Sequence, residues 1–459
     1  MGAFRKITLA DLYALIALGF GIFFIAATPP FGAGDETAHF ERAYEIAAGK
    51  FMGAEGVPAG MQDLMDDAFG RVKSGEAVTG EDYARWSRYP LRSDEITPWP
   101  EPVRVVMRLH SPFCYAHLAP VAAVGVALGL PPLEIFYLGR LAALLAGVFL
   151  VRAAISRAPS TLRAPLVAIA LLPTAIVYFS AFNIESLLVG AGFYFFAIIA
   201  SLAATPEEKI NRGDIIRLAA FGFLLGQFKT AYLLAPFAAL VLPATIFENA
   251  RQRLSVLALT ILPGAATSLV WAMAVKTQMI DGLVYSTMDG NRVDPSAQLA
   301  GVLADPIGYL GVLARTVFAS DMPGAAWQSF LGLAGWSNIA VPAPVYALLT
   351  LGLILVWLSG EKAPPALTTR FALATQISVF AATTLAILTL VYFQWDGVGD
   401  KVIVGFQGRY FLAIAPLLIA AAPVRLSLMA APGRREAAAV GIPLLGLLAM
   451  AAAVTARYF

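Results

Sequence analysis

Charged residues, cysteines and histidines are all scarce in this chain. Asp, Glu, Lys and Arg make up 14% of its 459 residues, whereas soluble domains carry about 25%. The polar side chains are therefore too few to cover a water-soluble fold of this size. The single cysteine, Cys114, excludes a disulfide framework and a thiolate zinc cluster. Three histidines leave little room for a histidine metal site, and a net charge of +2 gives no reason to expect a nucleic-acid partner.

Long apolar runs fill the sequence instead, since 59% of the residues are hydrophobic. A membrane span needs about 20 mostly apolar residues. The candidate runs are 9–29, 111–130, 133–151, 164–181, 186–203, 215–228, 231–247, 254–275, 340–358, 371–393, 409–424 and 437–455. This pattern predicts an all-α polytopic membrane protein that forms a single integral membrane domain over residues 1–459.

Lys and Arg residues in short loops predict how these spans are oriented. The basic loops are 152–163, 204–217, 248–253, 359–370 and 425–436. They lie two runs apart, so they share one side, which the positive-inside rule makes cytoplasmic. Arg5 and Lys6 place the N-terminus there too, provided that the run 111–130, which ends in Pro131-Pro132, does not cross. We therefore expect eleven spans and an outer C-terminus. A cleaved signal peptide is the alternative for the first run, although roughly 20 apolar residues exceed the usual length.

Two long segments then face outward, and the first of them, 30–132, begins with an acidic motif. Asp35, Glu36 and His39 follow the first span directly. In a helix that begins near Asp35, Asp35 and His39 share one face. A partly desolvated carboxylate has a raised pKa that suits a general base, so these three residues are the catalytic candidates. The simpler interpretation is that two acids begin an interfacial helix. The second outward segment is 276–339.

Further polar residues lie at the outer ends of the predicted spans. The candidate ligands of a lipid phosphate are Arg409, Lys229, Arg140 and Gln407, because Lys and Arg hold phosphates at this depth. Cations at a membrane boundary also serve as simple anchors. The candidate substrate-binding residues are His110, Asn183, Glu185, Tyr410 and Trp336. Asn183 and Glu185 alternatively cap a helix, and Trp336 alternatively belongs to an interfacial aromatic belt.

Five motifs in a fixed order resemble a family of bacterial polytopic membrane proteins of uncharacterised function that is grouped with the GT-C type glycosyltransferases. These motifs are Gly34-Asp35-Glu36-Thr37-Ala38-His39-Phe40-Glu41-Arg42-Ala43-Tyr44, Leu172-Pro173 through Asn183-Ile184-Glu185-Ser186, Lys229-Thr230-Ala231-Tyr232, Phe330 to Trp336, and Gly405-Phe406-Gln407-Gly408-Arg409-Tyr410-Phe411. The resemblance covers nearly the whole chain. One departure is Glu185, where the family usually has Asp, which puts any role that depends on aspartate geometry in doubt.

The resemblance implies a GT-C-like bundle with juxtamembrane helices in the first outer loop. It implies transfer of a sugar from a polyprenyl-phosphate donor to a cell-envelope glycan or lipid acceptor on the periplasmic face of the bacterial inner membrane. Asp35 would be the general base of an inverting reaction, and Arg409, Lys229 and Arg140 would stabilise the leaving phosphate. No cofactor is required by this chemistry, although a divalent metal near Asp35 remains an option.

Two other functions compete with this one. A lipid or glycan transporter or flippase usually has ionisable residues near the bilayer midplane, whereas here they gather at the outer ends of the spans. A non-catalytic membrane scaffold would keep Asp35 in a salt bridge rather than in a cavity. A glycan polymerase or ligase would share the site of a single-sugar transferase, and these two enzymes are not separated by the sequence.

Overall fold

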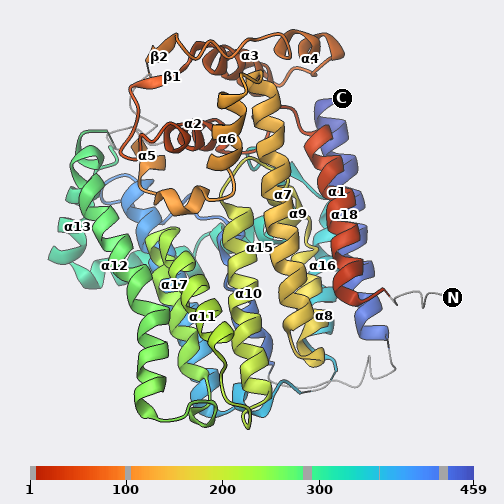
Figure 1. Ribbon diagram of the computed structural model, residues 1–459, viewed down its shortest axis with the longest axis vertical. Coiled ribbons are helices and arrows are strands. Elements are labelled where there is room, and N and C mark those ends of the chain that lie inside the picture. Colours follow the sequence, from red (N-terminus) through yellow and green to blue (C-terminus); the bar gives the residue numbers. More distant parts are fainter. Residues whose placement is uncertain (1–6, 99–104, 283–291, 361, 423–432) are drawn as a thin grey trace.

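Long helices run side by side along the longest axis of the molecule, and a layer of short helices covers one end of them (Figure 1). The computed structural model describes residues 7–98, 105–282, 292–360, 362–422 and 433–459. Arg5, Lys6 and part of the basic loop 425–436 lie outside these ranges. The described chain is mostly helical, as expected for an all-α membrane protein.

Six of the described helices are long and apolar enough to cross a membrane. They are α1 (Leu9–Ala27), α7 (Pro132–Arg157), α10 (Glu185–Ala204), α12 (Ala250–Gly282), α17 (Arg370–Gln394) and α18 (Arg434–Tyr458). Two bent pairs raise the number to eight if each pair is one span. These pairs are α8 (Ser160–Ala170) with α9 (Pro173–Phe179), bent by 72°, and α13 (Pro295–Ala304) with α14 (Pro306–Phe318), bent by 108°.

The expected count of eleven spans is therefore not confirmed. The other apolar runs form shorter elements, several of them 3₁₀ helices: α11 (Arg212–Gln227), η2 (Thr230–Val241), η3 (Ala244–Ile246), α16 (Ala343–Leu358), η5 (Gly408–Phe411) and η6 (Ala415–Ala421). A further short 3₁₀ helix, η4 (Pro365–Leu367), lies in the basic loop 359–370. Pro236 lies inside η2 and Pro416 in the first turn of η6. Proline lacks the backbone donor that a continuous α-helix needs. The runs 231–247 and 409–424 are therefore as apolar as a membrane span, but neither forms one long α-helix.

The covering layer comes from the first long segment. It contains α2 (Glu36–Ala47), α3 (Ala59–Ser74), α4 (Gly80–Trp86), α5 (Val105–Arg108), η1 (Pro112–Tyr115), α6 (Ala119–Ala127) and the antiparallel strands β1 (Gly56–Pro58) and β2 (Ile96–Pro98). The apolar run 111–130 forms only η1 and the 9-residue α6, which is too short to cross a bilayer.

Ion pairs bring the start of α1 together with the basic loops 152–163 and 204–217, and Figure 1 shows the end of α7 and the start of α8 at the end of the bundle away from this layer. Arg152 near the end of α7 binds Asp11 in the first turn of α1, so both elements meet at one end. Arg157 pairs with Asp214 at the start of α11 at 2.6 Å. The N-terminal helix thus begins beside the loop 152–163, as the distribution of Lys and Arg predicts.

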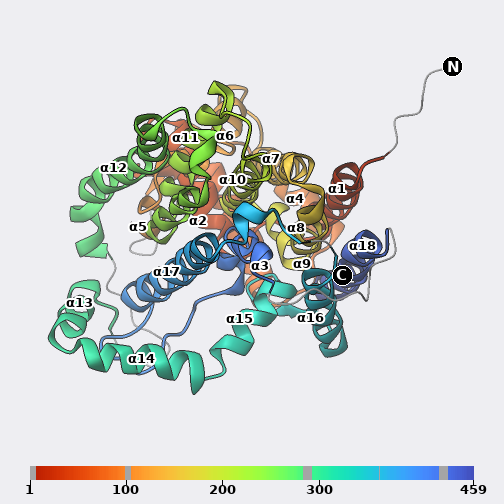
Figure 2. The ribbon, with the colours of Figure 1, turned by 90° about the horizontal axis from the view of Figure 1, so that it is seen from below.

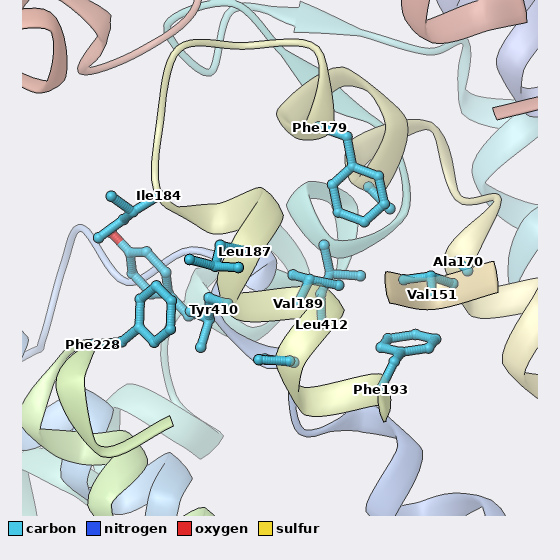
Figure 3. Packing of buried hydrophobic residues seen from close by; sticks show 14 of the residues in the cluster. Val151, Ala170, Phe179, Ile184, Leu187, Val189, Phe193, Phe228, Tyr410 and Leu412 are labelled. Carbon is cyan, nitrogen blue, oxygen red and sulfur yellow. The ribbon is translucent and has the colours of Figure 1, made fainter. Parts of the chain in front are cut away.

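Buried aromatic and aliphatic side chains around α10 form the core that leads to the site. Figure 3 shows Phe193 and Val189 of α10 packed between Val151 and Leu412, with Tyr410 and Phe228 at one end of the same cluster. Gly192 allows this contact, because a Cβ there would lie 2.1 Å from the carbonyl oxygen of Ala413. The chain after η5 is therefore held directly against α10.

The segment before α16 completes the wall of the bundle near the site. It consists of α13, α14, α15 (Met322–Leu331) and a short hairpin of β3 (Leu333–Ala334) and β4 (Ile339–Ala340). Gly408 packs on α15, because its Cβ would lie 1.9 Å from the oxygen of Ala326. Its amide also donates to Ser329 Oγ at 2.6 Å. These contacts fix the position of Gly408, the residue that precedes Arg409.

Candidate functional site

A strained turn between α1 and α2 presents Asp35. Phe31 and Asp35 both have left-handed backbones, with φ of 63° and 67°, which costs a non-glycine residue roughly 1–2 kcal/mol. The turn is held from distant parts of the chain. Gly34 N donates to Gly335 O at 3.1 Å, Trp336 Nε1 donates to Phe31 O at 3.0 Å, and the hydroxyl of Tyr458 in α18 donates to the carbonyl of Gly32 at 2.9 Å.

Glu36 lies on the opposite side of this turn, in a fully buried ion pair with Arg140. Arg140 donates through Nε and Nη2 to the two carboxylate oxygens at 2.8 and 2.7 Å, and neither side chain is exposed. Glu36 also accepts from the amides of Ala33 and Phe182. Arg140 also donates to the carbonyl oxygen of Thr28 at the end of α1. Both side chains hold the turn, and neither is among the residues that line the cavity beside Asp35. The catalytic role of Glu36 and the phosphate-binding role of Arg140 stay predictions.

Asp35 instead faces a small cavity under the covering layer, which polar and apolar side chains line together. This cavity has a volume of about 100 Å³. The residues with polar side chains in its lining are Asp35, His39, His110, Glu185, Lys229, Thr230, Gln394, Trp395 and Tyr410. Six of these residues are predicted site residues that come from well-separated positions in the sequence. The cavity lies where α10 begins and where α11 and α17 end, and therefore not near the middle of the long helices.

Arg409 lies behind this lining and contacts both acids. Its Nη2 donates to Asp35 Oδ2 at 2.9 Å, and its Nε lies 3.8 Å from Glu185 Oε1. The guanidinium lies over the ring of Tyr178 at 4.5 Å, and Lys229 Nζ lies 3.5 Å from the centre of the Tyr410 ring. Two cations, two carboxylates and two tyrosine rings thus form one cluster, in which the Asp35 side chain is 34% exposed.

The charges around Asp35 set its protonation state. Burial works to raise the pKa of Asp35, but the charge of Arg409, the electrostatic interaction with His39, the hydrogen bond from Arg409 and the charge of Lys229 together outweigh it, so the pKa lies below its ordinary value. The expectation of a raised pKa is therefore wrong, because the desolvation argument took no account of Arg409. Asp35 is ionised at neutral pH.

The histidines beside Asp35 are neutral for the opposite reason. Burial lowers the pKa of His39, and the nearby acids Glu185 and Asp35 only partly oppose this. Burial and the charge of Lys229 lower the pKa of His110 well below its usual range. His39 Nδ1 shares a hydrogen bond of 2.8 Å with the hydroxyl of Tyr115, and its ring stacks near that of His110. A neutral imidazole at this position orients polar groups in the cavity without adding charge.

Three other predicted site residues support the site from outside the cavity. Asn183 Oδ1 accepts from the amide of Glu185 at 3.0 Å, so Asn183 orders the start of α10. Trp336 holds the turn through Phe31 and packs on Phe69. Gln407 immediately precedes η5 and does not line the cavity. These three do not line the Asp35 cavity, and the substrate-binding or phosphate-binding roles predicted for them stay predictions.

Several residues at the site were missed by sequence reasoning. Tyr115 and Tyr178 lie within apolar runs, and nothing in the sequence separates them from core tyrosines. Gln394 is a polar residue at the last position of α17, so the criterion that selected Lys229 would have found it. Within the described ranges, no group of three or more His, Cys, Asp or Glu side chains is placed to hold a metal ion.

A wide apolar groove adjoins the Asp35 cavity. Its volume is about 840 Å³, and it lies between the end of α2, η1, α6, α11 and α12. Two pairs of consecutive residues form the shared wall, since His110 and Phe228 line the cavity while Ser111 and Gln227 line the groove. Ser111 Oγ donates to Gln227 Oε1 at 3.0 Å, which closes this wall. The charged cluster around Asp35 and the apolar groove are therefore separated by a wall that is one residue thick.

Comparisons with known proteins place the chain in a family. Neither the curated proteins nor the solved structures contain a match. The model of a family described as predicted membrane protein (DUF2142) matches residues 18–418. This match covers most of the chain, and the protein therefore belongs to the DUF2142 family of predicted membrane proteins.

Proposed function

We propose that this protein is a GT-C-like membrane glycosyltransferase that moves a sugar from a polyprenyl-phosphate donor to a hydroxyl of a glycan or lipid acceptor. The observation that carries the proposal is the position of Asp35. Its ionised carboxylate faces a cavity that also contains Lys229, with Arg409 directly behind it. A carboxylate next to two cations fits a reaction that removes a proton and releases a phosphate.

In the proposed reaction, Asp35 acts as the base, and Lys229 and Arg409 stabilise the leaving group. Asp35 accepts the proton of the acceptor hydroxyl while the acceptor oxygen attacks the anomeric carbon of the sugar. The bond from this carbon to the phosphate oxygen breaks, and polyprenyl phosphate leaves with the bonding electrons. Lys229 and Arg409 stabilise the negative charge that develops on this oxygen. Attack from the face opposite the leaving group inverts the anomeric centre.

The apolar groove fits the rest of such a donor. A volume of about 840 Å³ with an almost entirely apolar lining suits an isoprenoid chain, which contributes only apolar surface. Because Ser111 and Gln227 separate the groove from the cavity by a single layer, a chain in the groove would bring its phosphate to Lys229.

The cavity must widen before it accepts a sugar. A volume of about 100 Å³ corresponds to roughly three water molecules, whereas ligand pockets are typically about 300–1,000 Å³. For the donor to bind, its phosphate must replace Asp35 as the partner of Arg409. A phosphate that binds Arg409 takes its guanidinium away from Asp35 and leaves the carboxylate free to act as a base. The donor therefore binds before the acceptor.

The location of the site favours a transferase over a flippase. The cavity lies at the ends of α10, α11 and α17, at the end of the bundle opposite the basic loops. A flippase is expected to keep its ionisable groups near the midplane. With the basic loops cytoplasmic, the site is periplasmic and the protein belongs in a bacterial inner membrane. The acidic cluster needs no cofactor for this chemistry.

A transfer assay with purified protein in nanodiscs tests this function. A panel of polyprenyl-phosphate sugars is supplied with hydroxyl acceptors, and release of polyprenyl phosphate is measured by mass spectrometry. Asp35→Asn should lower turnover by roughly 100-fold or more. Asp94→Asn is a matched control, because Asp94 is an exposed acid of the covering layer outside the cavity. Wild-type turnover in Asp35→Asn removes this residue from the mechanism. Lipid translocation in proteoliposomes without any transfer supports the flippase instead.

A further inference from the structure

Two residues of the Asp35 cavity, His39 and Glu185, have no part in the bond-making and bond-breaking steps of the proposed reaction. In the view along the long helices, α2 lies near the middle of the bundle, with α10 and α17 on either side of it (Figure 2). His39 comes from α2 and Glu185 from the start of α10, and both line the cavity. They are only 3% and 7% exposed. Polar groups that are buried in this way normally have hydrogen-bond partners.

Tyr115 in η1 contacts His39 and is held in place by the end of α11. Ser111, the N-cap of η1, donates to Gln227 Oε1 at 3.0 Å, and the thiol of Cys114 donates to the carbonyl oxygen of Gln227 at 2.8 Å. Gln227 is the last residue of α11 and is buried. The Tyr115 side chain is itself fully buried. Its hydroxyl is therefore fixed at 2.8 Å from His39 Nδ1.

The hydroxyl of Tyr115 determines which nitrogen of His39 carries the ring proton. Burial raises the pKa of this hydroxyl well above its usual range, so the hydroxyl keeps its proton. Among the described residues its single hydrogen-bond partner is His39 Nδ1, and a buried donor without an acceptor is costly. The tyrosine therefore donates and Nδ1 accepts. Because burial lowers the pKa of His39 and keeps the imidazole neutral, the one ring proton lies on Nε2.

His39 Nε2 is thus a hydrogen-bond donor that is available to a ligand. It forms no hydrogen bond with any residue in the described part of the chain. The ring of His110 lies 6.4 Å away, measured between the ring centres, with an angle of 26° between the two planes. The imidazole of His39 is therefore supported on one face by His110 and at Nδ1 by Tyr115, while Nε2 has no partner.

Glu185 is the complementary group, an acceptor without a donor. Its carboxylate accepts no hydrogen bond from the described residues, and Oε2 is buried with no partner. Arg409 Nε lies 3.8 Å from Oε1, which is beyond hydrogen-bond distance. After burial, which lowers the pKa of His39, the charge of Glu185 has the largest effect on that pKa and raises it. Glu185 and His39 therefore lie close together in the cavity.

We propose that His39 and Glu185 together bind one hydroxyl group of the donor sugar, with Tyr115 as the positioning residue that makes His39 a donor. A hydroxyl group both donates and accepts, so it donates to the Glu185 carboxylate while its oxygen accepts from His39 Nε2. An ammonium group offers His39 no acceptor, and a carboxylate is repelled by Glu185. The assignment of this hydroxyl to a sugar rests on the proposed transferase function, whereas the tautomer of His39 does not.

Solid-state NMR of the full chain in lipid bilayers tests the tautomer. Isotope-labelled histidine gives signals from three residues, and those of His39 are identified by their loss in His39→Gln. Carbon–nitrogen correlations should show a bare Nδ1 and a protonated Nε2. Tyr115→Phe should give a mixture of tautomers, whereas the control Tyr13→Phe removes a buried hydroxyl outside the cavity and should not. A proton on Nδ1 in wild type overturns the proposal whether or not the protein is a transferase, as does an unchanged tautomer in Tyr115→Phe.

Binding of donor analogues without an acceptor tests the hydroxyl site. The probes are the glucose, galactose and mannose esters of decaprenyl phosphate, together with decaprenyl methyl phosphate, which has the same chain and phosphodiester but no sugar. In native mass spectrometry, wild type should retain at least one sugar probe about tenfold better than the methyl probe. His39→Phe and Glu185→Leu should each remove most of this preference. Retention of the methyl probe should not fall, because neither change removes a cation from the cavity.

A conservative variant separates the hydrogen bond from a packing effect. His39→Gln keeps an N–H donor at the end of its side chain, so it should retain a sugar preference that His39→Phe loses. Equal loss in these two variants overturns the hydroxyl site, as does full preference in Glu185→Leu or no sugar preference in wild type. If the preference is found but no sugar reaches any acceptor, the transferase proposal fails while the binding site stands.

Discussion

Arg140 and Glu36 form a two-point ion pair that is completely buried and connects four parts of the chain. Through this pair, the end of α1, the turn before α2, the middle of α7 and the segment before α10 are joined by hydrogen bonds of 2.6–2.8 Å. The turn carries Asp35, and the segment before α10 leads to Glu185. The pair therefore fixes the distance between the two acids that Arg409 contacts.

Loss of one partner from this pair should destabilise the protein strongly. Arg140→Ala leaves the Glu36 carboxylate buried without a cation, which typically costs about 3–5 kcal/mol. We expect a clearly lower midpoint of thermal unfolding in nanodiscs. Glu36→Leu combined with Arg140→Met should recover much of this loss, because an apolar pair of similar size avoids the desolvation penalty. An unfolding midpoint in Arg140→Ala that equals that of wild type contradicts the role assigned to the pair.

Removal of Arg409 should move the pH dependence of turnover upward. The guanidinium helps to hold the pKa of Asp35 below its ordinary value, so Arg409→Gln raises that pKa. Because Asp35 must be ionised to accept a proton, the acidic limb of the profile of kcat/KM against pH shifts to higher pH. The KM for the donor should rise as well, since a phosphate ligand is lost. Arg88→Gln serves as the control, and an acidic limb that does not move rules out the electrostatic coupling.

The residues that lie at helix ends were predictable from the sequence. Lys229 lies where an apolar run ends, and Glu185 where one begins. A charged residue at such a position in a membrane protein is expected either in a polar cavity or at the membrane interface. His39 was found through its spacing from Asp35 on one helix. The broad class of the fold follows from composition for the same reason, because the polar side chains are too few for water.

Other features depend on tertiary contacts that a sequence does not reveal. Asp35 and Glu36 are adjacent, yet the left-handed backbone at Asp35 sends one side chain to the cavity and the other to Arg140. The lowered pKa of Asp35 depends on Arg409, which is 374 residues away in sequence. Helix breaks near proline change the number of continuous spans while leaving the hydropathy of each run unaltered.

A methyl group at Gly408 should impair the site without touching any charged group. Its Cβ would lie 1.9 Å from Ala326 O and 2.3 Å from Phe330 N, so the chain that carries Arg409 must shift. We expect turnover to fall by about tenfold or more, since small displacements of catalytic groups are costly. Gly441→Ala is the matched control, because its Cβ meets nothing within 4 Å in α18. Turnover in Gly408→Ala that matches the control shows that the position of η5 does not matter.

A bulky side chain in the apolar groove should distinguish donors by the length of their isoprenoid chain. Ala266 of α12 lines the groove and is exposed there, so Ala266→Trp fills space without reaching Lys229 or Asp35. The KM for a long-chain donor should rise by about fivefold or more, because apolar contact with the groove is lost, while that for a short-chain donor changes little. Ala314→Trp, on the exposed side of α14, is the control for a bulky residue at the lipid surface. If both donors are affected equally, the groove does not hold the isoprenoid chain and the damage lies at the catalytic cavity itself.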